Sequence, residues 1–146
     1  MRIAYGLLLI VSLIVSPVRA TEPIVVITAA NNSLNTLTLD TLKLVYLRKQ
    51  LINESGMRWI PVNLSIQDAL RRDFSLALFN LLPEEQDEYW NIQYFNGITP
   101  PKVVASEEAV LRFVVLTQGA IGYIHKQKVD KRVKVLLIIK LPTTVN

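Results

Sequence analysis

The segment that decides the fold is Tyr89–Gly122, YWNIQYFNGITPPKVVASEEAVLRFVVLTQGAIG. Its aromatic first part predicts a helix ended by Gly97, because glycine readily adopts the positive φ of a helix C-terminus. A Pro-Pro pair then interrupts the chain, and Ser106 is the expected N-cap of a second helix. We expect that helix to end at Gly119 and to lead into a strand at 120–124. The first helix is predicted to bury an aromatic face made of Tyr89, Trp90, Ile92, Tyr94 and Phe95.

Strands and helices alternate along the rest of the chain. Apolar runs at 24–28, 59–63 and 133–141 predict strands, the first of them buried on both faces, and residues 103–104 a short extended piece. Helices are predicted after Thr38, after Ser65 and from Pro83. This alternation predicts a single three-layer α/β domain with a mainly parallel or mixed sheet. In the helix after Ser65 the predicted buried face is Ile66, Leu70, Phe74, Leu78 and Leu81, opposite Gln67, Asp68, Arg71, Arg72 and Ser75.

Residues 1–20 have the pattern of a secretory signal peptide. Arg2 precedes an uncharged apolar stretch, and Val18-Arg19-Ala20 supplies the small residues of a cleavage site. The alternative, a membrane anchor, needs about 18 or more apolar residues, and this run is shorter. We therefore expect cleavage after Ala20, a periplasmic domain at 21–146, and no stable membrane insertion afterwards. The chain has no cysteine, so disulfides and cysteine metal sites are excluded.

The charge and the single histidine narrow the classes of function. Loss of Arg2 and Arg19 would leave 14 basic and 12 acidic residues, a balance that gives no support to a nucleic-acid partner. His125 alone cannot supply a histidine zinc site, and a catalytic triad would need a nucleophile and an orienting acid beside it. We therefore expect no cofactor, no metal site and no catalysis. A hydrolase acting through Ser65 is the third hypothesis.

One helix start has the chemistry of an anion site. Ser65, following the strand that ends at Asn63, is a candidate N-cap, with Asp68 three residues later. The free amides and the dipole of a helix N-terminus attract anions. The alternative is an ordinary N-cap followed by two surface arginines, Arg71 and Arg72.

Several motifs in this order resemble a known family. They are the segments Thr38–Leu42 and Trp59–Val62, the pair Tyr89-Trp90, the triplet Phe95-Asn96-Gly97, and Gly119–Tyr123. Together they are similar to the second domain of the phosphate ABC-transporter substrate-binding proteins, over about Ile24–Tyr123. The resemblance implies one lobe of a type II periplasmic-binding fold. It also implies a non-catalytic protein that binds phosphate or a related small oxyanion in connection with ABC transport.

The chain departs from the family pattern in two ways. Family members have two domains that close on the ligand, whereas this chain has the length of one. The family's anion loop carries an arginine and Ser-Gly-Thr, where this chain has Asn63-Leu64-Ser65-Ile66-Gln67-Asp68. The resemblance places the ligand-binding residues at Asn63, Ser65, Ile66, Gln67 and Arg71.

These departures leave two functional hypotheses. The first is an oxyanion-binding protein with an ABC permease as partner, in which pairing of two chains would imitate the missing domain. The second is an interaction or sensory module that kept the fold, lost the anion pocket and serves an envelope sensor.

Overall fold

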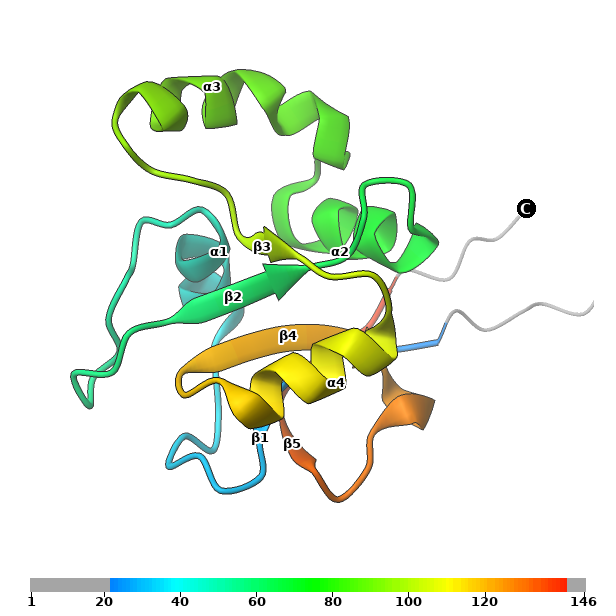
Figure 1. Ribbon diagram of the computed structural model, residues 1–146. Coiled ribbons are helices and arrows are strands. Elements are labelled where there is room, and N and C mark those ends of the chain that lie inside the picture. The colour runs from blue at the N-terminus through cyan, green and yellow to red at the C-terminus, as the bar shows by residue number, and fades with distance from the viewer. Residues whose placement is uncertain (1–21, 142–146) are drawn as a thin grey trace, which may run out of the picture.

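The computed structural model describes residues 22–141, which form one five-stranded sheet with helices on both faces (Figure 1). The sheet order is β3-β2-β4-β1-β5. The strands are β1 (Ile24–Ala29), β2 (Ile60–Asn63), β3 (Lys102–Val103), β4 (Ala120–His125) and β5 (Val133–Ile139).

Strand directions make the sheet mixed. β2 runs parallel to both β3 and β4, whereas β1 is antiparallel to β4 and to β5. β1 is therefore the strand that opposes the other four. The predicted α/β domain with a mainly parallel or mixed sheet is confirmed.

The helices are α1 (Leu39–Tyr46), α2 (Ala69–Phe79), α3 (Asp87–Phe95) and α4 (Glu107–Leu116), with 3-10 turns η1 (Pro83–Gln86) and η2 (Lys126–Lys128). α4 lies on one face of the sheet, in front in Figure 1, and α1 and α2 lie behind it. Gly122 in β4 lets α4 approach, because a Cβ there would collide with Val110. These are the three predicted layers.

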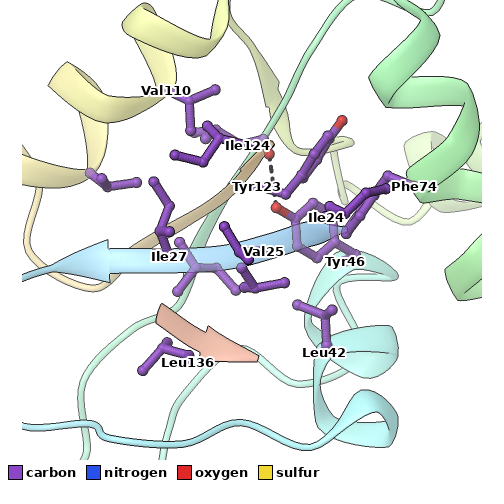
Figure 2. Packing of buried hydrophobic residues seen from close by; sticks show 14 of the residues in the cluster. Ile24, Val25, Ile27, Leu42, Tyr46, Phe74, Val110, Tyr123, Ile124 and Leu136 are labelled. Carbon is purple, nitrogen blue, oxygen red and sulfur yellow. Dashed lines mark hydrogen bonds between the residues drawn. The ribbon is translucent and has the colours of Figure 1, made fainter. Parts of the chain in front are cut away.

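The core behind the sheet is built on three aromatic rings (Figure 2). Phe74 of α2 stacks on Tyr123 of β4 at 3.7 Å between ring centroids, and Tyr46 of α1 packs edge-on against Phe74 at 4.9 Å. The Tyr46 hydroxyl donates a hydrogen bond to the carbonyl of Val62 at 2.9 Å. Since these rings join both helices to the sheet, truncation of Phe74 to alanine should cost about 3–5 kcal/mol.

The predicted buried aromatic face of α3 is wrong. None of its nine residues is buried, and Ile92, Tyr94 and Phe95 are 55%, 69% and 89% exposed. The reason is tertiary, since α3 follows η1 away from the sheet and has no sheet face to cover (Figure 1).

Of the two glycines predicted to end helices, Gly97 does so and Gly119 does not. Gly97 follows the end of α3 with a φ of 75°, as predicted. α4 instead ends at Leu116 with Thr117 as its C-cap. Gly119, with a φ of 79°, belongs to the turn that leads into β4.

The predicted signal peptide at 1–20 lies outside the described residues. Within residues 22–141 no helix has the length and apolar character needed to cross a membrane.

Candidate functional site

The candidate site lies at the end of the sheet where the parallel strands β2, β3 and β4 have their carboxyl ends. We call this end of the sheet the carboxyl edge. β2, β3 and β4 share a direction, so their carboxyl ends meet there, and the starts of α2 and α4 follow β2 and β3 at this edge. In α/β sheets ligands bind outside the carboxyl ends of the strands, and helix N-termini attract anions. This edge is therefore where an anion would be sought.

The N-cap of α2 is Asp68 and not Ser65. Asp68 accepts a hydrogen bond from the backbone N–H of Leu70 at 2.9 Å, and the helix begins at Ala69. Residues 65–68 form a turn in which the Asp68 N–H bonds to the Ser65 carbonyl at 3.0 Å. Serine and aspartate are both common N-caps, and a carboxylate also complements the positive end of the helix dipole.

This later start changes which side chains the loop presents. The Ser65 hydroxyl donates to the Gln67 side-chain oxygen at 2.5 Å, so these two predicted site residues bind each other. Ile66, predicted on the buried face, is 47% exposed, and Leu81 is 41% exposed. Both lie outside α2, so the helical periodicity that predicted their burial does not apply to them.

Asn63 is buried at the end of β2 and is held by Tyr123. The Tyr123 hydroxyl donates to Asn63 Oδ1 at 3.1 Å and accepts from the Leu64 N–H at 3.2 Å. Burial raises the pKa of Tyr123, which keeps its hydroxyl a donor. Among residues 22–141 the amide nitrogen of the Asn63 side chain donates no hydrogen bond, so a donor remains available.

Arg71 in the first turn of α2 was predicted on the polar face, but its guanidinium is partly buried. Its Nε is buried and has no hydrogen-bond partner within residues 22–141. Burial lowers the pKa of Arg71, while Tyr123 and Tyr46 act in the opposite direction. Tyr123 therefore lies close to both Arg71 and Asn63. Among the described residues no carboxylate forms an ion pair with Arg71.

Ser75 was also predicted on the polar face and is buried. Its hydroxyl donates to the Leu81 carbonyl at 2.7 Å and accepts from the side-chain amide of Gln86 at 2.6 Å. These bonds link the end of α2 to η1.

The start of α4 holds a cluster that sequence reasoning missed. The Glu107 carboxylate accepts from the His125 N–H at 2.7 Å and from Lys128 Nζ at 2.8 Å, and it lies 3.0 Å from His125 Nδ1. Burial tends to raise the pKa of Glu107, but these bonds outweigh it and hold the pKa below its ordinary value. The partners of Glu107 lie 18 and 21 positions away in the chain, and local sequence patterns carry no signal at that separation.

Charges at the starts of α2 and α4 act on the same lysine, Lys128. The hydrogen bond to Glu107 chiefly raises the pKa of Lys128, and Asp68 adds to this effect. The edge thus contains two cations, Arg71 and Lys128, beside two carboxylates, Asp68 and Glu107. An incoming anion would gain the cations and the Asn63 amide but would face both carboxylates.

A cavity of about 440 Å³ lies at the opposite edge of the sheet. Turns 31–33 and 117–119 line it together with Met57, and none of its lining residues is charged. Because an oxyanion would find no cation there, the carboxyl edge remains the candidate site. Among residues 22–141 no group of three or more acidic or histidine side chains could hold a metal ion.

Comparison with known proteins gives a result at the level of the fold. No family model matches the sequence, and no curated protein matches it. Solved structures do. One comes from Clostridium perfringens, assigned as a phosphate ABC transporter substrate-binding protein and solved with bound phosphate. It has 21% identity and a TM-score of 0.66, and the match covers 80% of this chain and 45% of that one.

Two more solved structures agree. An ABC-type phosphate transport receptor from Vibrio cholerae has 17% identity and a TM-score of 0.64, and PstS from Borrelia burgdorferi has 18% and 0.57. Each match covers 80% of this chain, against 46% and 47% of those chains. The chain thus spans less than half the length of the proteins it resembles. The structure has the fold of one part of the phosphate ABC transporter substrate-binding proteins.

Proposed function

We propose that this chain is a non-catalytic periplasmic binding protein for phosphate or a related small oxyanion, which it binds at the carboxyl edge of its sheet. The observation that carries the proposal is Arg71. Its guanidinium is partly buried and pairs with no carboxylate among residues 22–141, which favours an anion, because hydrogen bonds between ionised groups are about twice as strong as neutral ones. Asn63, which the Tyr123 hydroxyl holds at the end of β2, would supply a second donor.

The remaining parts of the proposal rest on the solved structures. Their names describe phosphate binding and ABC transport, which supports an ABC permease as partner and a periplasmic location. In this proposal residues 1–20 are removed as a signal peptide and residues 21–146 form the mature domain. Since binding proteins close two lobes on a ligand, a second chain would complete the cleft.

Affinity should be low. The Leu70 N–H is already bound to Asp68, and Glu107 occupies the start of α4. An oxyanion must therefore bind against two carboxylates with one partly buried arginine in its favour. We expect a Kd on the order of 1 mM, which corresponds to about −4 kcal/mol.

Isothermal titration with inorganic phosphate tests the proposal. Arg71→Gln should abolish the heat of binding. Arg72→Gln, which removes the same charge from the neighbouring residue, should leave it unchanged, because Arg72 pairs with Glu84 on the surface. Absence of heat from the unmodified protein up to about ten times that Kd, or equal effects of the two variants, would refute phosphate binding through Arg71.

A second candidate function is favoured by Asp68. Its carboxylate caps α2 at the position an anion would take, so the chain would keep the fold as an interaction module whose anion site is filled from within. Under this reading the unmodified protein gives no heat with phosphate, while Asp68→Asn does. If neither protein binds, the carboxyl edge is not an oxyanion site at all.

A further inference from the structure

Helix α3 presents an apolar surface to solvent. We call Ile92, Tyr94 and Phe95 the α3 surface; they are 55%, 69% and 89% exposed. The rings of Tyr94 and Phe95 lie edge to face with centroids 6.3 Å apart. Exposed apolar side chains gathered on one element mark interaction sites more often than chance.

The helix is held in place although it buries none of its own residues. The Tyr89 hydroxyl donates to the Leu47 carbonyl at 2.6 Å. Lys49 Nζ lies 5.8 Å from the centre of the Tyr89 ring. A nine-residue helix is marginal in water by itself. These contacts anchor the inner side and leave the α3 surface preformed for a partner.

We propose that the α3 surface inserts into an apolar groove of a partner protein whose rim carries lysine or arginine side chains. Residues 83–101 contain four acids, Glu84, Glu85, Asp87 and Glu88, and no basic residue. Arg72 pairs with Glu84. Among residues 22–141 the other three acids form no ion pair, and they lie in η1 and in the first turn of α3. A basic rim complements them, whereas an anionic lipid surface would be repelled.

The shape of the helix argues against symmetric pairing of two copies of this chain through α3. α3 lies apart from the sheet, at the top of Figure 1, and forms a ridge about 14 Å long, the length of a helix of nine residues. Two such ridges would bury far less than the roughly 800 Å² per partner of a stable interface. A groove encloses a ridge on several sides, as in other helix-in-groove contacts.

Photo-crosslinking in the cells that make the protein tests the proposal. A benzophenone amino acid replaces Phe95, and a control protein carries it at Arg112, which is exposed on α4. Crosslinked peptides are mapped by mass spectrometry. We expect position 95, but not position 112, to crosslink to another protein. The crosslinked peptide of that protein should be apolar and flanked by basic residues. Glu88→Lys should lower the crosslinking yield severalfold, and Glu54→Lys, an exposed acid in another loop, should not.

The other outcomes overturn the proposal. One is the absence of any adduct at position 95, and another is an adduct with a second copy of this chain or with lipid. The last is a crosslinking yield that Glu88→Lys does not change. The thermal midpoint of each variant is measured first. Phe95 is 89% exposed, so its replacement should leave the fold intact. Phosphate titration reports the oxyanion proposal separately.

Discussion

Replacing Asp68 by asparagine should increase the affinity for phosphate. The Asp68 carboxylate accepts from the Leu70 N–H at 2.9 Å and so lies where an anion at the start of α2 would bind. Asparagine is an equally good N-cap, and its side-chain oxygen can keep this bond. The substitution therefore removes a charge while the helix start is retained.

The size of the effect follows from Coulomb's law. Two unit charges about 4 Å apart repel by about 4 kcal/mol at an effective dielectric constant of about 20. Asp68 is half-buried, so solvent and salt reduce this to about 1.5–3 kcal/mol. The Kd for phosphate should fall about tenfold to a hundredfold, by the rule that 1.4 kcal/mol is a factor of ten. Loss of the dipole interaction should cost about 0.3–1 kcal/mol of stability.

The assay is isothermal titration of both proteins with phosphate at neutral pH and fixed ionic strength. Asp73→Asn is the matched control, since it removes the same charge from α2 further from the helix start. A change below threefold for Asp68→Asn, or an equal gain for Asp73→Asn, would refute the view that Asp68 occupies the anion position. Higher salt should narrow the difference between Asp68→Asn and the unmodified protein.

Four further substitutions test the fold. Arg48 follows α1 with a φ of 60°, so Arg48→Gly should raise stability to denaturant by about 1 kcal/mol, and a lower thermal midpoint would contradict this. Gly119→Ala should lose more than about 2 kcal/mol, because the new Cβ would collide with the Arg58 carbonyl. Gly56→Ala, at a similar φ with open space around it, should lose only about 1 kcal/mol; equal losses would show that φ and not the collision matters. Glu107→Gln should cost about 2 kcal/mol at neutral pH. Because the pKa of Glu107 is depressed, its stabilisation is present above the ordinary value of 4.5 and is lost as pH falls below it. Denaturation measured from pH 6 to about 3 should therefore show a shallower loss in the variant, and parallel curves would contradict the reasoning.

The fold class was predictable because it depends on local patterns. The apolar run at Ile24–Thr28 has the composition of a strand buried on both faces, and it forms the buried interior strand β1, between β4 and β5. Thr38 and Ser106 cap helices as predicted, since capping needs only a side chain and the next three residues. The positive φ at Gly97 is a property of the same kind.

The candidate site was less predictable. Ser65 and Asp68 are both good caps, and choosing between them depends on where the chain leaves β2. Helical spacing assigned Arg71 to the face opposite the apolar one, yet its guanidinium lies partly buried near Tyr123, 52 positions away in the chain. The periodicity of α3 predicted a buried face, but periodicity does not say whether a surface is there to cover it.

The sequence by itself determined the alternation of strands and helices, and with it the three-layer α/β domain. A continuous apolar run favours a buried strand, and a capping side chain satisfies the free backbone N–H groups of a helix start. Both effects depend on residues close together in the sequence. Only the tertiary structure decided that Asp68 caps the start of α2 and that Glu107 contacts His125 and Lys128. It also decided that no carboxylate in the described part of the chain pairs with Arg71. These depend on groups far apart in the chain, and the energy of a charge is set by what lies around it in space.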